Sequence, residues 1–262
     1  MFELILFNLL LLLACMVGLW LLSILLRDVS FIDSFWAFGF VVVAVVTYFV
    51  FLPAPRGVAS QLLLVLTAVW GMRLDTYLFL RWRRDGADPR YLRMIEKASG
   101  NPHLFTLTSV FLLQGLMIAF ISMPIQLGML ADSGAAPGPA AWLGIALFTV
   151  GFLFESIGDH QMTAFRADPA NRGTVMDRGL WRYTRHPNYF GDASVFWGIW
   201  LVAWDAGAPW WSAAGPLLLN WTLVRWSGAA LLERRMKRSR PGYEEYIART
   251  SSFIPWPPKK QS

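Results

Sequence analysis

Long apolar stretches limit what this chain can fold into more than any other feature of its sequence. A helix that crosses a bilayer needs about 20 mostly apolar residues. Seven stretches meet this requirement, at roughly 2–26, 31–52, 59–80, 104–130, 140–165, 188–204 and 209–232. Charged residues make up only 15% of the chain, whereas soluble domains carry about 25%. We therefore expect an all-α integral membrane protein with seven transmembrane helices, folded as a single polytopic domain over residues 1–262.

The distribution of basic residues predicts how the chain is threaded. Of the 23 Lys and Arg residues, 19 lie in segments 81–97, 166–185 and 234–260. With seven spans these segments share one side of the membrane, which the positive-inside rule assigns to the cytoplasm. We expect an outside N-terminus, a cytoplasmic C-terminus and a multi-pass location in a bacterial inner membrane. The first apolar stretch has no basic region before it, so we expect a retained span rather than a cleaved signal.

The positive charge also bears on partners. It follows the topology and does not form a basic stripe interleaved with aromatic residues, so we expect contact with membrane lipid but not with nucleic acid. No obligate protein partner is evident. The three His residues are scattered and there is one Cys, so the sequence predicts neither a metal site nor an internal disulfide.

Polar residues recur at helical spacing inside the apolar stretches. The three sets are Arg73, Tyr77 and Arg84; Glu155, Asp159 and Arg166; and Asn188 with Asp192. Ionisable residues in a membrane are costly and mark a functional cavity by default, so we expect these faces to converge on a polar cofactor. The alternative is that they are ion pairs that fix helix register, or side chains that reach the interface. Glycines at 144, 151 and 158 predict a close helix-packing seam.

The segment 181–192 concentrates groups that suit a phosphate. Arg182 and Arg185 precede Pro187, which stands where a helix would begin. A helix N-terminus offers free N–H donors, and arginines add bidentate contacts. Together with Arg172, the positive charge exceeds what a pyrophosphate requires, which predicts NADPH rather than NADH. Because the sequence has no Gly-x-Gly fingerprint, we expect membrane-helix side chains to hold the cofactor, on the cytoplasmic side.

The run Arg185-His186-Pro187-Asn188-Tyr189-x-Gly191-Asp192 resembles the membrane steroid reductases, which include steroid 5α-reductases, sterol C14/C7 reductases and bacterial 5α-reductase-like proteins. The resemblance is strong over 150–256, where Tyr243-Glu244-Glu245-Tyr246 and Phe253-Ile254-Pro255-Trp256 resemble the way those proteins end, and weaker over 30–100. It implies a substrate side in 1–100 and an NADPH-binding half in 140–258. With the motif residues included, the expected cofactor-binding set is Arg73, Arg84, Glu155, Asp159, Arg166, Arg172, Arg182, Tyr183, Arg185, His186, Asn188, Tyr189, Asp192, Tyr243 and Tyr246.

The same resemblance suggests the substrate side. A substrate-facing acid of that family falls at Asp33, and the tyrosine that binds the ketone falls on Trp70. We expect Asp33 and Tyr77 to be catalytic, and Trp36 and Trp70 to bind substrate. A carboxyl in an apolar span is desolvated and so tends to stay protonated, as a general acid requires. The alternative for Asp33 is an ion pair with Arg73.

Three functions are compatible with the sequence. The first is NADPH-dependent reduction of the conjugated C=C bond of an apolar enone such as a 4-en-3-one steroid, with hydride to the β-carbon and a proton to the α-carbon. The second is an isoprenylcysteine methyltransferase-like enzyme that binds S-adenosylmethionine and shares a similar Arg-His-Pro-x-Tyr motif. The third is a non-catalytic sterol- or lipid-binding membrane protein.

Overall fold

The computed structural model describes residues 1–226 and 229–259. The described chain is helical and contains no β-strand, with only an isolated bridge between Thr184 and Ser251. It packs as two compact units, Met1–Ala141 with Val202–Gly215, and Trp142–Leu201 with Pro216–Ser262. The predicted all-α class is confirmed for these residues.

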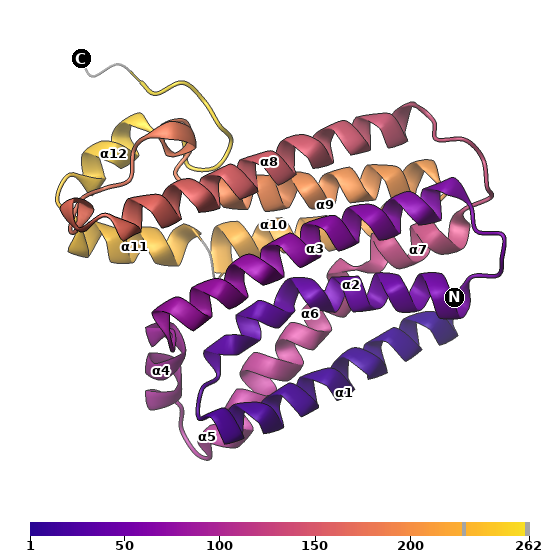
Figure 1. The fold of residues 1–262 in the computed structure, drawn as a ribbon, viewed down its shortest axis with the longest axis horizontal. Coiled ribbons are helices and arrows are strands. Elements are labelled where there is room, and N and C mark those ends of the chain that lie inside the picture. The colour runs from indigo at the N-terminus through magenta and orange to yellow at the C-terminus, as the bar shows by residue number, and fades with distance from the viewer. Residues whose placement is uncertain (227–228, 260–262) are drawn as a thin grey trace. The chain divides into compact units, whose positions relative to one another are not determined.

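Figure 1 shows the helices in chain order. The first unit contains α1 (Phe2–Leu26), η1 (Ser30–Phe35), α2 (Trp36–Val46), η2 (Thr47–Phe51), α3 (Val58–Asp85), α4 (Pro89–Glu96), α5 (Pro102–Thr106), η3 (Leu107–Leu112), α6 (Leu113–Ile121), α7 (Met123–Ala131) and η6 (Trp210–Ala213). The second contains η4 (Pro169–Asn171), η5 (Gly179–Arg182), η7 (Thr222–Trp226), α11 (Ala229–Ser239) and α12 (Tyr243–Arg249). The chain passes between the units within α8 (Pro139–Ala167), α9 (Pro187–Asp205) and α10 (Ala214–Trp221).

Among the described residues, five helical segments are long and apolar enough to cross a membrane. They are Phe2–Leu26, Ser30–Phe51, Val58–Asp85, Pro102–Ala131 and Pro139–Ala167. They coincide with the first five predicted spans, and they give the chain the character of a multi-pass membrane protein. The sixth predicted span corresponds to the 19-residue helix α9. The seventh, 209–232, is divided among η6, α10, η7 and the start of α11, and residues 227–228 of it lie outside the described chain. The seven-span count and the orientation therefore stay predictions.

Helix ends in the first unit meet in the order that alternating spans require. Trp82, near the end of α3, donates from Nε1 to Asp28, which follows α1, at 2.7 Å. At the other end of α3, the backbone N–H of Ser60 in the first turn donates at 2.7 Å to Asp132, which follows α7. The chain after α1 and the end of α3 thus lie together, and so do the start of α3 and the end of α7.

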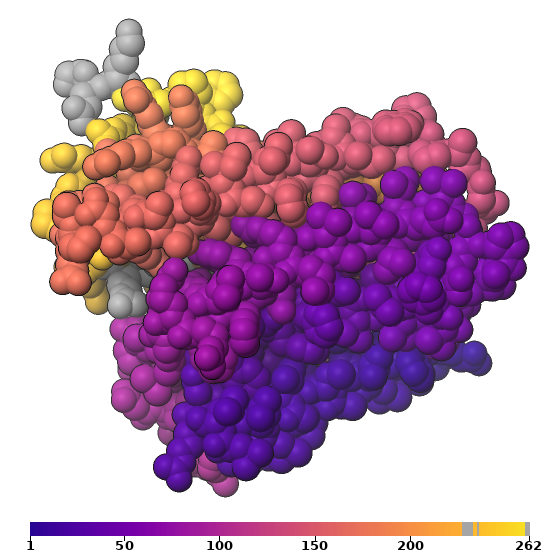
Figure 2. Space-filling view, viewed as in Figure 1, coloured from indigo at the N-terminus to yellow at the C-terminus, as the bar shows by residue number. Residues whose placement is uncertain are grey.

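Helix α1 is apolar on all sides and lies at the surface of its unit, where indigo marks it in Figure 2. Its polar residue Asn8 is fully buried and donates from Nδ2 to Thr47 at 3.0 Å and to Gln126 at 2.9 Å. Without water in an apolar layer, such hydrogen bonds between helices fix their register. Asn8 therefore ties α1 to η2 and α7.

Glycines allow α8 and α9 to approach closely in the second unit. A Cβ on Gly191 would lie 2.5 Å from the backbone nitrogen of Glu155 and 2.5 Å from the carbonyl oxygen of Gly151. One on Gly198 would lie 2.6 Å from the carbonyl oxygen of Gly144. Real Cβ atoms do not come this close, so only glycine fits. The predicted small-residue seam on α8 is confirmed, and its partner is α9.

Candidate functional site

The α8–α9 seam of the second unit carries a group of buried acids. Glu155 and Asp159 of α8 are 2% and 5% exposed, and Asp192 of α9 is 8% exposed. Gly191, directly before Asp192, packs against the backbone of Glu155, and Gly158, directly before Asp159, packs against the start of α9, so the three acids lie on adjacent turns of the seam. Carboxylates at this depth in apolar helices are costly to retain. Two of the three polar faces predicted from spacing are therefore brought together here.

Asn188 lies on the first turn of α9, where Gly158 of α8 packs against its backbone nitrogen and against Pro187. Pro187 begins the helix, as its fixed φ favours. Next to it, the ring of Tyr189 stacks on His186 with centroids 5.3 Å apart. The start of α9 is thus held against α8 on one side and against the preceding loop on the other.

Arg185 and His186 hold the loop before α9, residues 181–186 and below called the motif loop, to the C-terminal part of the chain. Both are buried, and Arg185 Nε and His186 Nε2 lie 2.8 and 3.0 Å from the same carboxylate oxygen of Glu233. Arg185 also donates to the carbonyl oxygens of Ile247 and Thr250. The sequence predicted both residues as cofactor contacts. Their positions show a structural connection, so we interpret them as positioning residues.

Glu233 is a part of this region that the sequence analysis missed. Burial alone would raise its pKa, but hydrogen bonds from His186 and Arg185 lower the pKa to about 2. The carboxylate is therefore charged at neutral pH. The available signal was an acid at the start of a strongly basic segment, which a count of positive charges passes over.

Tyr243 and Tyr246 on α12 are 4% and 2% exposed, and their rings lie 5.7 Å apart. The hydroxyl of Tyr246 donates to the carbonyl oxygen of Trp181 in the motif loop. Burial, with the nearby charge of Glu233, raises the pKa of Tyr243 to about 12. Both tyrosines were predicted to bind the cofactor. That role stays a prediction; in the described chain both side chains are enclosed, and Tyr246 holds α12 to the loop that carries Trp181.

Four of the predicted cofactor residues are exposed in the second unit. They are Arg166 at the end of α8, Arg172 after η4, and Arg182 and Tyr183 before the motif helix. Arginine side chains in this setting can reach a phosphate without displacing an internal partner. They are the part of the predicted phosphate site that the fold leaves accessible.

The third predicted face lies on α3 in the first unit. The guanidinium of Arg73 lies over the ring of Tyr77, 5.7 Å from its centroid, in a cation–π arrangement. Arg84 is exposed and pairs with Asp85 at 2.6 Å. The helix thus places Arg73 and Tyr77 on one face, as their spacing predicts.

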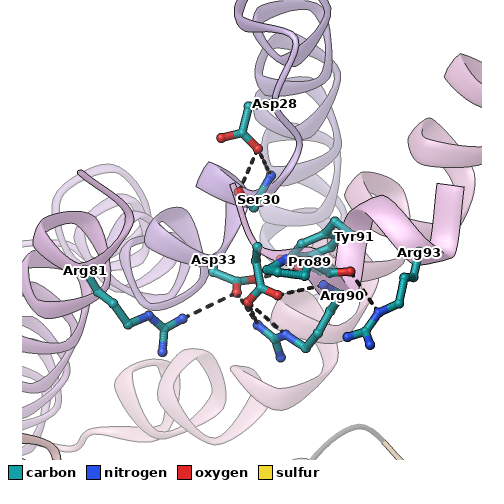
Figure 3. Close-up of polar contacts among 10 residues, drawn as sticks. Asp28, Ser30, Asp33, Arg81, Pro89, Arg90, Tyr91 and Arg93 are labelled. Atoms are coloured by element: carbon teal, nitrogen blue, oxygen red, sulfur yellow. Dashed lines mark hydrogen bonds and ion pairs between the residues drawn. The ribbon is translucent and has the colours of Figure 1, made fainter. Parts of the chain in front are cut away.

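Asp33 lies in the short helix η1 and accepts from residues of the α3–α4 region (Figure 3). The hydroxyl of Tyr91 donates to Oδ1 at 2.5 Å, and Arg90 Nη2 donates to Oδ2 at 3.0 Å. Arg81 lies 3.8 Å from Oδ2. We expected a desolvated carboxyl that acts as a general acid, or else an ion pair with Arg73. The described ion pairs are instead with Arg81, near the end of α3, and with Arg90, in the first turn of α4. The reason is that η1 lies beside the end of α3 and the start of α4, where these basic residues are concentrated.

Tyr91 is the second functional candidate that the sequence analysis missed. Asp88 caps helix α4 by accepting from the Arg90 N–H at 2.8 Å, and Pro89 occupies the first turn. This start directs Tyr91 to Asp33, and Gln114 donates to the phenol oxygen at 3.4 Å. Burial and the charge of Asp33 raise the pKa of Tyr91 well above its usual value. The phenol is therefore protonated at neutral pH.

Trp36 and Trp70, the predicted substrate residues, pack around Phe40 in the first unit. The two rings lie 5.7 and 5.6 Å from Phe40 in edge-to-face geometry. Trp70 is fully buried, and Gly71 beside it packs against Ala37. This is the environment of a core residue, and binding of a substrate by Trp70 stays a prediction.

The family assignment comes from the sequence as a whole. A model of proteins of unknown function, DUF1295, matches residues 19–250. This chain belongs to the DUF1295 family. The DUF1295 match takes in the Asp33 cluster, the α8–α9 seam and Glu233. An uncharacterized protein of Schizosaccharomyces pombe is 26% identical over 270 aligned residues, which cover 90% of this chain and 75% of that protein. No solved structure matches this DUF1295 member.

Proposed function

We propose that this protein is an NADPH-dependent reductase of the conjugated C=C bond of an apolar enone, with 4-en-3-one steroids as the first class to test. The observation that carries the proposal is that Glu155, Asp159 and Asp192 are buried on adjacent turns of the α8–α9 seam. Such a group is expensive unless a polar ligand or a specific network uses it. The resemblance of the 185–192 run to membrane steroid reductases supports the same reading.

The chemistry of these residues fits NADPH. Carboxylates of the seam can accept from ribose hydroxyls, and the amide of Asn188 can both donate and accept. Exposed Arg166, Arg172 and Arg182 can pair with phosphates, including the 2′-phosphate. Arg185 and His186 orient the loop through Glu233. When bound, NADPH supplies a hydride for the β-carbon of the enone.

The chain must also stabilise the negative charge that develops on the ketone oxygen. We assign this task to Tyr91 with Asp33, because the phenol is a protonated donor held at 2.5 Å from the carboxylate. To act, the hydroxyl exchanges its bond to Asp33 for one to the substrate oxygen, while Arg90 retains Asp33. The catalytic role of Tyr77 expected from the sequence stays a prediction; its ring contacts the guanidinium of Arg73. The α-carbon receives its proton from a side chain or water.

The test uses the full chain in lipid nanodiscs. Loss of NADPH absorbance is followed with a panel of 4-en-3-one steroids and other enones, and the products are identified by mass. We expect turnover that depends on the enone, with NADPH preferred over NADH. In parallel, binding of NADPH and of S-adenosylmethionine is measured by calorimetry. Binding of S-adenosylmethionine alone would establish the methyltransferase-like alternative, and lipid binding without either cofactor would establish the non-catalytic one.

A further inference from the structure

Two large apolar side chains near the C-terminus are exposed although the backbone that carries them is fixed. Ile254 is 65% exposed and Trp256 is 70% exposed. The Trp256 N–H donates to the carbonyl oxygen of Tyr183 at 2.9 Å, and Thr184 donates to the carbonyl oxygen of Phe253 at 2.8 Å. Figure 1 shows this yellow segment leaving α12. The hydrogen bonds of its backbone therefore hold these two apolar side chains in exposed positions.

The segment alternates between its two sides. Phe253 points inward, where its ring lies 6.3 Å from that of Phe190. Ile254 and Trp256 follow on the outer side, with the less exposed Pro255 between them. Alternation of this kind is the property of an extended segment. One side of the segment, with Phe253, packs on α9. The other side, with Ile254 and Trp256, is not buried by any described residue.

The inner contacts place the segment beside the apolar part of α8. Phe190, which contacts Phe253, also lies 5.1 Å from Phe154 of α8. Next to Phe154, Leu153 is 48% exposed, and Ile157 one turn further is 42% exposed. Helix α8 is one of the segments apolar enough to cross a membrane. The exposed apolar side chains of α8 and the outer side of the tail segment thus lie at about the same level of the second unit.

The chemistry of the outer side matches the boundary between acyl chains and headgroups. Trp is enriched at that boundary because its ring is amphipathic. Two exposed basic residues lie near the segment: Lys259 follows it in sequence, and Arg182 precedes Tyr183, whose carbonyl oxygen accepts from the Trp256 N–H. Basic side chains favour anionic headgroups. We infer that Ile254 and Trp256 insert into the bilayer interface and make 253–256 a membrane anchor for the C-terminal tail. This anchor does not depend on the proposed reductase activity.

The inference has a direct test in vesicles of phosphatidylcholine and phosphatidylglycerol. Single nitroxide labels are placed through Ile254→Cys and Trp256→Cys in a Cys15→Ser background. Leu153→Cys serves as a lipid-facing control, and Glu244→Cys, exposed on α12, serves as a water-facing control. Collision of each label with oxygen and with a water-soluble nickel chelate is then measured. We expect oxygen-to-nickel ratios at 254 and 256 that are several-fold above the ratio at 244 and no higher than the ratio at 153.

Two results would overturn the anchor. A ratio at 254 and 256 equal to that at 244 would place them in water, and low collision with both reagents would show that protein covers them. The unmodified chain provides a second measurement that needs no substitution. A phospholipid with a photoreactive group near its glycerol is crosslinked and the adducts are mapped by mass. We expect adducts on the peptide that contains Ile254 and Trp256, and their absence there, with adducts present at Leu153, would reject the anchor.

Discussion

Arg185 Nε lies 2.8 Å from Glu233 Oε1, and this ion pair joins the motif loop to a helix 48 residues further along the chain. His186 shares the same oxygen at 3.0 Å. Arg185 and His186, the basic residues of the 185–192 run, therefore make contacts inside the second unit. The candidates for the proposed contact with a phosphate are then the exposed Arg166, Arg172 and Arg182.

Glu233→Gln should destabilise the second unit. The substitution removes the negative charge that Arg185 and His186 face, while it keeps the size of the side chain. We expect the free energy of unfolding to fall by about 1.5–3 kcal/mol, the range for hydrogen bonds to charged groups. Denaturant titration in detergent micelles measures this change. Glu244→Gln, on the exposed side of α12, is the matched control and should change stability little. An equal loss in both variants would contradict the role of Glu233.

The pKa of Glu233 predicts a stability loss in acid. The pKa is about 2 in the folded chain and 4.5 for the ordinary carboxyl. A lowered pKa contributes stability above the unfolded value, and this contribution disappears as the pH falls through the folded value. The difference in stability between wild type and Glu233→Gln should therefore be constant above pH 4.5 and shrink from there towards pH 2. A difference that persists at pH 2 would show that the charge is not its cause.

Gly191→Ala should loosen the α8–α9 seam. The added methyl group would lie 2.5 Å from backbone atoms of Gly151 and Glu155, which cannot move aside as a flexible side chain can. We expect a loss of about 1–3 kcal/mol in unfolding free energy, as for other overpacked sites. Gly18→Ala on α1 is the control, because no described atom outside the neighbouring backbone of α1 lies within 4 Å of its added Cβ. That change should be neutral or stabilising by up to about 1 kcal/mol, since alanine favours helix over glycine. The same sign in both variants would contradict the close packing.

Asn188→Ala and Asp192→Ala should impair cofactor binding without unfolding the protein. Each removes a polar group from the first two turns of α9 at the seam. If the contact is charge-assisted, its loss costs about 1.5–3 kcal/mol, which calorimetry would detect as weaker NADPH binding. Thr149→Ala, on the exposed face of α8, provides the control. Normal NADPH affinity in both variants would mean that the polar face of α9 is structural.

Tyr91→Phe should lower turnover while NADPH affinity stays unchanged. The variant keeps the ring but loses the hydroxyl that donates to Asp33, and we expect a decrease of at least about tenfold, the scale of general acid catalysis. Asp33→Asn should lower turnover on the same scale. Tyr48→Phe, whose ring contact with Arg56 needs no hydroxyl, is the control. Weaker NADPH binding with normal turnover in Asp33→Asn would place Asp33 with the cofactor instead.

The sequence by itself determined the local features of this protein. The length of the apolar stretches predicted the five helical segments that are long and apolar enough to cross a membrane, because apolar length depends only on consecutive residues. Helical periodicity placed Glu155 and Asp159 on one face of α8, and the glycine repeat predicted the seam that α9 fills. These inferences need only the geometry of a single helix.

Only the tertiary structure decided which of these residues meet. Asp33 pairs with Tyr91, which lies 58 residues away on a helix that looked like a basic loop. Arg185 turns inward to Glu233 although its place in the motif predicted a phosphate contact. The physical reason is that an ion pair or a buried hydrogen bond depends on where two distant segments cross, and spacing along one helix carries no record of that crossing.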